Sequence, residues 1–323
     1  MAHRLSKPIS ETGAPWTAEA GTRSVKVIVN IAAGAGRPQD WLSTLEQTCR
    51  ERGLDAELVR VSDAAQLLSA AREAVRQGAK LVVAGGGGGT VSAVASCLAD
   101  TGVALGVLPL GTLNHFAKDL GIPLELDPAI DVLAHGRQAQ VDMGEVNGRL
   151  FINNSSLGLY PDIVLDRERQ RHRLGRGKWA ALLTASIHAA RRYPVLSVHI
   201  EVNGTELERR SAFVFIGNNE YRMEGFNIGE RTRLSDGKLS LYVTQRTGRF
   251  GLLRLALLAL AGRLRQARDF DVLMARAFVV RTKHRRLRVA TDGEVQQMET
   301  PLHYRIRPGA LRVLVPAESA VTK

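Results

Sequence analysis

Short apolar runs alternate with amphipathic segments over residues 25–120. This alternation limits the possible folds more than any other feature of the sequence. Runs such as VKVIVN and LVVAG have the length and the β-branched content of buried strands. The segment AAQLLSAAREAVRQG instead repeats apolar residues such as Leu67, Ala71 and Val75 at helical spacing, and Gly78 follows as a C-terminal cap. Strands that alternate with helices predict βαβ units, so we expect an α/β domain with a mostly parallel sheet.

The pattern changes after about Asp142, where short strand-like runs follow one another, among them RLFINNSSLG, LHYRIRP and LRVLV. Asn-Gly and Asp-Gly pairs separate these runs, which indicates an all-β domain built as an antiparallel sheet or sandwich. Two helical segments interrupt it, GKWAALLTASIHAARRYP and RFGLLRLALLALAGRLRQARDF. We therefore expect a flexible lead-in at 1–23, an α/β domain at 24–140, a β-sandwich domain at 141–316 and a tail at 317–323. A return of the last strand to the first domain stays open.

The charge balance points to an anionic partner. The formal net charge is +12, and aromatic residues make up only 5% of the chain, without the interleaving of aromatic and basic residues that stacks bases. We therefore expect phosphate-bearing small molecules or an acidic membrane surface as partners, and no nucleic acid.

Neither a cysteine-bound metal nor a membrane span is expected. Cys49 and Cys97 lie outside any CxxC or Cys/His cluster, so we interpret both as buried thiols. The longest apolar run, residues 252–261, contains Arg254 and is far shorter than the roughly 20 residues that cross a bilayer. The first residues lack the apolar core of a secretory signal, so we expect a cytoplasmic protein.

Five consecutive glycines follow the strand-like run LVVA and precede a helical segment. At such a junction the helix offers free N–H groups to an anion, and a backbone without Cβ atoms lets phosphate oxygens approach closely. The alternative is a tight turn without a ligand. The run is not a Walker A loop, because no Gly-Lys-Ser/Thr follows, and the GxGxxG fingerprint fails because its third glycine position is Thr90.

A second polar loop, LPLGTLNHFAKDLGIP, follows the next predicted strand. Adjacent parallel strands end at the same edge of a sheet, so Thr112 and Asn114 are expected to point toward the glycine run. The alternative is that either residue caps a short helix.

Four motifs in order, VNIAAG, GGGGGTVSAVA, LPLGTLNHFAKDLG and ATDGE, are similar to those of the diacylglycerol kinase catalytic-domain family. That family contains bacterial lipid kinases, sphingosine kinases and ceramide kinases, with NAD kinases more distant. The resemblance implies an α/β nucleotide-binding domain, a β-sandwich substrate domain, and ATP phosphates held in the cleft between them. The Asp-Gly-Glu and Asp-Gly turns fit the lipid kinases better than NAD kinases.

The resemblance also implies roles for individual residues. Glu294 is implied as the base that takes the proton of the lipid hydroxyl, with Asp292 beside it, although an Asp-Gly-Glu sequence can also be an ordinary exposed turn. The expected nucleotide contacts are Asn30, Gly34, Ser62, Gly86, Gly87, Gly88, Gly89, Thr90, Val91, Ser92, Thr112 and Asn114.

A structural Mg²⁺ is implied at the segment TRLSDGKLSLYV. Its ligands by position are the carboxylate of Asp236 and the carbonyl oxygens of Arg233 and Lys238, a hard-oxygen set that suits Mg²⁺. The turn is ordinary enough to form without a metal, and that alternative stays open.

One position departs from the family pattern. Members read Gly-Gly-Asp-Gly-Thr at the glycine run, and this chain has Gly88 where the aspartate belongs. Many members also read Asn-Asp-Phe where this chain has Asn114-His115-Phe116, and Asp119 is too far along a helix to replace either acid. The loss keeps the phosphate cradle and removes a charge that would help hold the catalytic metal.

The sequence thus favours an ATP- and Mg²⁺-dependent lipid kinase acting on diacylglycerol or a similar lipid. The alternative is a catalytically impaired nucleotide-binding module with a regulatory or membrane role. A lipid substrate implies peripheral contact with an anionic membrane on its inner face, and the Arg-rich residues 166–179 and the apolar residues 252–264 are the candidate contacts. A homodimer stays open.

Overall fold

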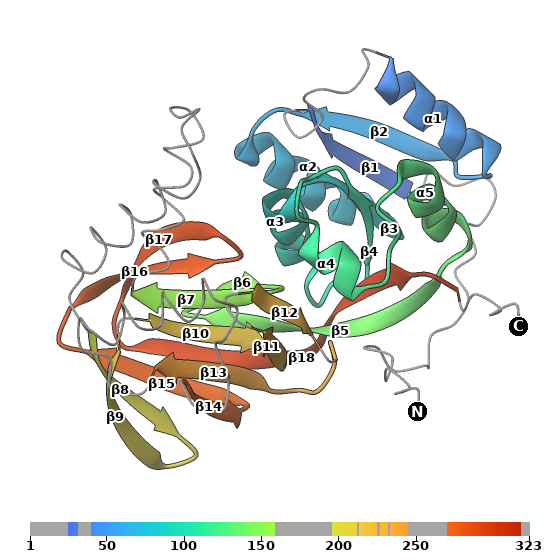
Figure 1. Cartoon of the computed structure of the whole chain (residues 1–323). Helices are drawn as coiled ribbons and strands as arrows, with labels where there is room; N and C mark the ends of the chain where they lie inside the picture. The colour runs from blue at the N-terminus through green and yellow to red at the C-terminus, as the bar shows by residue number, and fades with distance from the viewer. Residues whose placement is uncertain are drawn as a thin grey trace, which may run out of the picture. The chain divides into compact units, whose positions relative to one another are not determined.

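The computed structural model of the chain describes residues 25–31, 40–158, 196–211, 213–224, 227–231, 233–244 and 270–317 (Figure 1). The chain forms two compact units. The first consists of Met1–Met143, Arg233–Ser235 and Pro308–Lys323, and the second of Gly144–Thr232 and Asp236–Arg307. Gly34, residues 166–179 and the two helical segments predicted in the β-rich half, up to residue 269, lie outside the described residues.

The first unit is an α/β domain with a parallel sheet, as the sequence predicts. Its strands run in the order β2-β1-β3-β4, and each neighbouring pair is parallel. The strands are β1 (Val25–Asn30), β2 (Ala56–Val61), β3 (Leu81–Gly86) and β4 (Ala104–Pro109). β3 and β4 are buried along their whole length, which explains why they read as continuous apolar runs.

The helices described beside this sheet are α1 (Trp41–Glu51), α2 (Ala64–Arg76), α3 (Gly88–Leu98), α4 (His115–Asp119) and α5 (Leu126–His135). The strand order reverses between β1 and β3, so right-handed crossovers place α1 on the opposite face from α2 and α3. The contacts agree, because α2 packs beside α3, and α1 beside α5. The predicted helix α2 is confirmed, with Asp63 accepting a bond from the Gln66 N–H at 2.9 Å and Gly78 at φ +75° beyond its end.

The described residues of the second unit form only strands and their connections. A six-stranded antiparallel sheet has the order β14-β13-β10-β7-β16-β17. Its strands are β7 (Asn154–Gly158), β10 (Phe213–Asn218), β13 (Leu239–Thr244), β14 (Phe270–Ala275), β16 (Arg286–Thr291) and β17 (Glu294–Glu299). A second layer holds β8 (Leu196–Val202), β9 (Thr205–Ser211), β15 (Ala277–Thr282) and the first part of β18 (Leu302–Val315). A small pair, β11 (Tyr221–Glu224) and β12 (Asn227–Arg231), stands apart.

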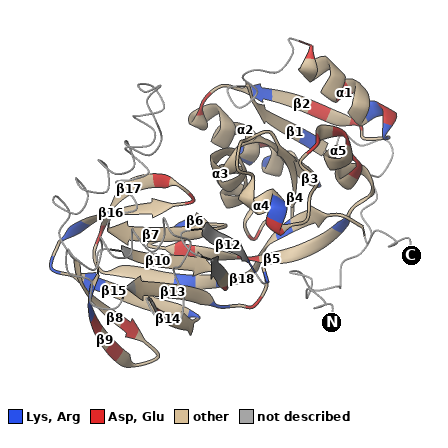
Figure 2. Cartoon of the chain, viewed as in Figure 1, with Lys and Arg blue, Asp and Glu red and all other residues tan. Residues whose placement is uncertain are grey.

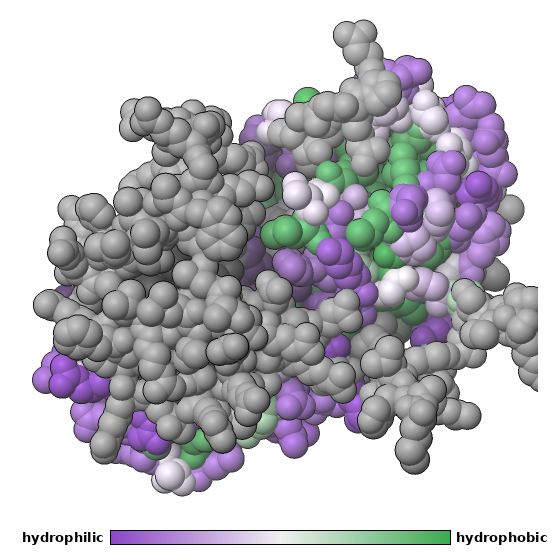
Figure 3. All heavy atoms as spheres, in the orientation of Figure 1, coloured by the Kyte–Doolittle hydropathy of each residue, from purple (hydrophilic) through white to green (hydrophobic). Residues whose placement is uncertain are grey.

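The core of this unit lies between the two layers. Leu157, Ile216 and Leu241 of the six-stranded sheet belong to one buried cluster with Val280 and Tyr304 of the other layer. The predicted sandwich therefore rests on side chains that alternate along each strand between this core and the outside. On the visible face of the first unit, hydrophobic and hydrophilic residues are intermixed (Figure 3).

Two strand predictions differ from the structure. The runs LHYRIRP and LRVLV form one continuous strand, β18, which also includes Gly309 and Ala310 between them. The strand continues because Gly309 adopts φ +58° and its N–H donates to the Asp142 carboxylate at 2.8 Å. The end of β18 pairs in parallel with β4, at Arg312 and Ala104.

The run RLFINNSSLG is likewise not one strand. It divides into β6 (Arg149–Phe151), which pairs with β5 (Arg137–Val146), and β7. The corner between β6 and β7 is formed by Ile152 and Asn153. The carboxylate of Asp292, distant in sequence, holds this corner through hydrogen bonds from the backbone N–H groups of the corner.

Candidate nucleotide and acceptor sites

The glycine run forms the end of β3 and the N-terminus of α3. Gly87 is the N-cap residue in an extended conformation, with no side-chain cap bond and no acidic residue in the first turn of the helix. Gly88 and Gly89 are exposed. The first N–H groups of a helix have no intrahelical acceptor, so this uncapped helix end can bind an anion such as a phosphate.

The structure explains some of the glycines by packing. A Cβ on Gly86 would lie 2.5 Å from the Thr90 Oγ1, and a Cβ on Gly111 would lie 2.5 Å from the Gly87 Cα. The glycine run and the loop after β4 therefore approach each other backbone to backbone. A Cβ on Gly88 would meet nothing within 4 Å, so no packing constraint requires glycine where the family has aspartate.

Asn30 ends β1 beside the glycine run. Its side-chain amide donates to the Thr90 Oγ1 at 3.3 Å, and Thr90 is buried. β1 and β3 are the strands between which the sheet order reverses, which is where open α/β sheets bind ligands. Asn30 and Thr90 are thus brought together at the expected edge.

The other residues predicted to contact the nucleotide differ in which of their groups a ligand could reach. Asn114 adopts φ +47°, and its side chain bonds the loop backbone at Gly111 and Pro109, so it stabilises the loop. Thr112 is exposed. The Val91 side chain is buried in the core, which leaves only its backbone as a contact.

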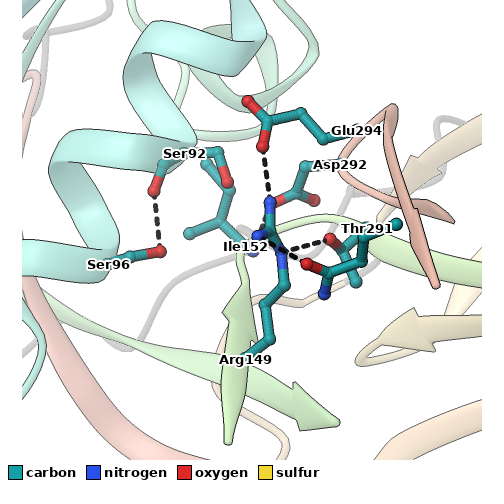
Figure 4. A network of polar contacts seen from close by, with 8 residues as sticks. Ser92, Ser96, Arg149, Ile152, Thr291, Asp292 and Glu294 are labelled. Carbon is teal, nitrogen blue, oxygen red and sulfur yellow. Dashed lines mark hydrogen bonds and ion pairs between the residues drawn. The ribbon is translucent and has the colours of Figure 1, made fainter. Parts of the chain in front are cut away.

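Two serines complete this set. The Ser92 carbonyl accepts a bond from the Ser96 hydroxyl at 2.9 Å (Figure 4). Ser62, exposed at the end of β2, is bonded to the Gln66 side chain through both its N–H and its hydroxyl.

Asp292 lies in the turn between β16 and β17 of the second unit. Its two carboxylate oxygens accept the backbone N–H groups of Ile152, Asn153 and Asn154 at 2.8 to 3.1 Å. The carboxylate therefore holds the corner between β6 and β7. The backbone at Asp292 has φ +49°, a conformation that Asp tolerates better than most residues.

Glu294 begins β17 and its side chain is 57% exposed. Its Oε2 accepts a bond from the Arg149 guanidinium at 2.5 Å. Arg149 also donates to the Thr291 hydroxyl at 2.9 Å and to the Gln296 side chain at 3.0 Å, so it is bound on three sides (Figure 4). Sequence reasoning missed Arg149, because it lies 145 residues from Glu294 and belongs to no motif.

The Asp236 turn supports a metal only in part. The Asp236 N–H donates to the Asn219 side chain at 3.1 Å, and the Lys238 carbonyl already accepts the Asn219 N–H at 3.0 Å. Asp236 with the carbonyls of Arg233 and Lys238 would supply three oxygens of the six that Mg²⁺ takes. Over the described residues, no group of three or more His, Cys, Asp or Glu side chains could hold a metal ion.

No carboxylate stands in the first turn of α3 to hold a catalytic metal there. His115 at the start of α4 is exposed, whereas Asp119 is buried. The residues of this loop therefore fit a phosphate better than they fit a protein-held Mg²⁺.

Comparison with known proteins identifies the family. Residues 24–146 match the family described as "Diacylglycerol kinase catalytic domain", and residues 162–315 match the "YegS C-terminal NAD kinase beta sandwich-like domain". A protein of Pseudomonas syringae pv. syringae named "Probable lipid kinase YegS-like" is 32% identical over 93% of this chain and 92% of its own length. The chain belongs to the diacylglycerol kinase catalytic-domain family.

Further relatives extend the diacylglycerol kinase likeness. A protein of Bacillus subtilis named "Diacylglycerol kinase" is 27% identical over 84% of this chain and 90% of its own length. The crystal structure of a diacylglycerol kinase from Bacillus anthracis has a TM-score of 0.65 at 21% identity, over 90% of this chain and 96% of that one. This last similarity supports the two-part fold. Among the helices described for this family member, none is long and apolar enough to cross a membrane.

Proposed function

We propose that the protein is an ATP-dependent lipid kinase that transfers the γ-phosphoryl group to the hydroxyl of diacylglycerol or a similar lipid. The observation that carries the proposal is the uncapped, exposed N-terminus of α3 at the edge where the sheet order reverses. In a family whose members are named lipid kinases, the anion that suits this helix end is the phosphate chain of ATP.

The glycine run would contact the phosphates through backbone N–H groups. Gly88 and Gly89 offer exposed backbone, and Asn30 supports the run by holding Thr90. Thr112 of the neighbouring loop is available as a hydroxyl donor, whereas Asn114 keeps that loop in shape. These contacts position the nucleotide, which is most of what phosphoryl transfer requires of a protein.

Glu294 would act as the base. Arg149 fixes the Oε2 of its carboxylate, and over the described residues no hydrogen bond occupies the Oε1. As the lipid oxygen forms a bond to the γ-phosphorus, the hydroxyl proton passes to Glu294, and the bond between the γ-phosphorus and the β–γ bridging oxygen breaks to release ADP. Asp292 contributes indirectly, because it fixes the turn that carries Glu294.

Mg²⁺, where bound, would neutralise charge on the transferred phosphoryl group. We propose that such a metal is held mainly by the nucleotide phosphates and water, since α3 offers no acid at Gly88. A separate structural Mg²⁺ would use Asp236 and the carbonyls of Arg233 and Lys238. A lipid acceptor also implies peripheral contact with an anionic membrane surface.

A second function is favoured by the same glycine. Without the family aspartate, the chain would be a catalytically impaired nucleotide-binding module that keeps a regulatory or membrane role. A Cβ at Gly88 would meet no atom within 4 Å, so a clash with a Cβ does not explain the glycine there.

The deciding experiment measures ATP-dependent phosphorylation of a lipid panel by the native chain, Gly88→Asp and Glu294→Gln. Gly88→Asn separates the added charge from the added side chain, and Glu299→Gln is the matched control at the far end of β17. Native activity that is lost in Glu294→Gln, and kept in Glu299→Gln, supports the kinase. Activity only in Gly88→Asp establishes a disabled kinase, and ATP binding without activity in any form supports the binding module.

A further inference from the structure

The chain from the end of β15 to the start of β16 carries a cluster of positive charge that the proposed chemistry does not use. The sequence RTKHRRLR contains Arg281, Lys283, Arg285, Arg286 and Arg288 and no acidic residue. We call residues 281–288 the basic corner, because they pass from one layer of the second unit to the other. Lys and Arg along this stretch can be followed in Figure 2.

The backbone of the basic corner is held firmly. The Thr300 hydroxyl donates to the His284 carbonyl at 2.7 Å, and the Thr300 N–H donates to the Arg285 carbonyl at 3.0 Å. Thr282 adds a bond between its hydroxyl and the His284 N–H at 3.2 Å. The N–H of His284 and the carbonyl oxygens of His284 and Arg285 are thus bonded within the protein.

The side chains at the tip point to solvent. Lys283, His284 and Arg285 are all exposed, and in the described part of the chain neither Lys283 nor Arg285 forms an ion pair or side-chain hydrogen bond. Two acids offset the flanking charges, since Arg281 pairs with Glu201 at 2.7 Å and Arg286 pairs with Glu299 at 3.2 Å. A net positive charge therefore remains on a fixed, exposed tip.

We infer that the basic corner is a docking surface for an anionic lipid bilayer. The choice of a bilayer rests on the proposed function, because a kinase that phosphorylates a lipid must reach its acceptor at a membrane. Charge complementarity supports it, since Lys and Arg are attracted to anionic head groups within about one Debye length of the surface. A nucleic-acid partner fits less well, because residues 281–288 contain no Phe, Tyr or Trp ring on which a base could stack.

The test compares vesicle binding by the native chain and by Lys283→Gln/Arg285→Gln, which removes two charges but none of the bonds that hold the corner. The control is Lys80→Gln/Arg276→Gln, which removes two charges from exposed sites elsewhere. Arg276 precedes β15, and the six residues of that strand separate it from Lys283 by about 20 Å, beyond the reach of screened charge at ordinary salt. Binding is measured by sedimentation with phosphatidylglycerol/phosphatidylcholine vesicles and with phosphatidylcholine vesicles alone.

Each Lys or Arg near an anionic surface changes affinity about fivefold, so the corner variant is expected to bind anionic vesicles roughly 25-fold more weakly at low salt. The control variant is expected to bind like the native chain, and high salt should remove the difference. Equal weakening in both variants, no weakening, or an equal loss on neutral vesicles would overturn the inference. So would a variant that loses single-stranded DNA binding but keeps vesicle binding.

Lipid phosphorylation in neutral detergent micelles separates this inference from the proposed function. The corner variant should keep its activity in micelles and lose it on anionic vesicles, because only the vesicles require docking. If no form of the protein phosphorylates lipid, the proposed kinase fails while the vesicle measurement still decides the docking surface.

Discussion

The Arg149 guanidinium and the Glu294 carboxylate meet at 2.5 Å, although the two residues are 145 positions apart in the sequence. Arg149 belongs to the short strand β6, and Glu294 begins β17. The proposed base is thus held by a side chain from another part of the β-rich unit. In the proposed reaction, this pairing would make Arg149 a positioning residue, which acts through Glu294 and not on the nucleotide.

Replacing Arg149 is therefore expected to lower kcat with little effect on ATP binding. We expect Arg149→Ala to lose about 10- to 100-fold in kcat, because the Glu294 carboxylate is no longer fixed, and Arg149→Lys to lose less. A double-mutant cycle with Glu294→Gln should show that the two losses do not add. Arg52→Ala, which removes an exposed pair with Asp131 in the other unit, is the control. Additive losses, or a large rise in the ATP dissociation constant, would contradict this role.

Asp292 is expected to matter first for stability. Hydrogen bonds to a charged group contribute about 1.5–3 kcal/mol each, and Asp292 accepts three from the corner between β6 and β7, so we expect Asp292→Ala to lower the free energy of unfolding by about 3 kcal/mol or more. Asp292→Asn keeps one acceptor oxygen and tolerates φ +49°, so its loss should be smaller. Urea denaturation measures both. Unchanged stability with lost activity would instead assign Asp292 to the chemistry.

The glycines should separate into two classes. A Cβ at Gly86 or Gly111 would approach neighbouring atoms to 2.5 Å, so Gly86→Ala and Gly111→Ala are expected to lower stability by about 1–3 kcal/mol. Gly88→Ala should be neutral or slightly stabilising, because its Cβ meets no atom within 4 Å and alanine favours the helix. Thermal unfolding of the three variants checks this order, and a destabilised Gly88→Ala would show that the space at Gly88 is not available.

The absence of an acid at Gly88 predicts how nucleotide binding would depend on metal. The first turn of α3 carries no acid, so the native chain is expected to bind ATP with only a small change between Mg²⁺ and EDTA. Gly88→Asp adds a negative charge near the phosphates, so its ATP affinity should fall in EDTA and recover with Mg²⁺. Calorimetry in both conditions tests the difference, with Gly88→Asn as the uncharged control. Equal metal dependence in all three forms would disprove it.

Glu145 predicts how stability responds to acid. Burial alone would raise the pKa of Glu145, but hydrogen bonds and positive charge from Arg305 and Arg307 outweigh burial and lower it. A lowered folded-state pKa means that the stabilisation is present above the unfolded-state value of 4.5 and is lost as the pH falls below it. The native chain should therefore lose stability more steeply than Glu145→Gln as the pH falls from about 5 to 3. Urea denaturation of both forms at several pH values measures the free energy of unfolding. An identical dependence on pH in the two forms would contradict the prediction.

Local sequence patterns predicted the fold well where the structure of a segment depends only on its own residues. The alternation from Val25 onward was sufficient for the parallel sheet, because buried strands and amphipathic helices have different periods. The sequence did not predict that one run divides into β6 and β7, or that two runs join in β18, because each outcome depends on a carboxylate distant in sequence. Asp292 ends the run at Ile152, and Asp142 carries β18 through Gly309.

The candidate site could be predicted only where it lies in a contiguous motif. The glycine run and the Asp-Gly-Glu turn are visible in the sequence, and Asn30 beside Thr90 follows from parallel pairing of β1 and β3. Arg149 could not be found, because its approach to Glu294 depends on how separate hairpins of the β-rich unit are placed. The hydrogen bonds from backbone N–H groups to the Asp292 carboxylate could not be predicted either, because they depend on the position of the corner between β6 and β7.

The unbroken course of β18 limits how this protein can be divided. The strand begins among antiparallel neighbours in the β-rich unit and ends beside β4 in the other, with no linker between. A fragment that stops before Leu302 would leave β4 as an unprotected edge, with unpaired N–H and C=O groups that invite association with other chains. The α/β unit is therefore expected to be soluble on its own only when the last strand is supplied, either in the same chain or as a separate peptide.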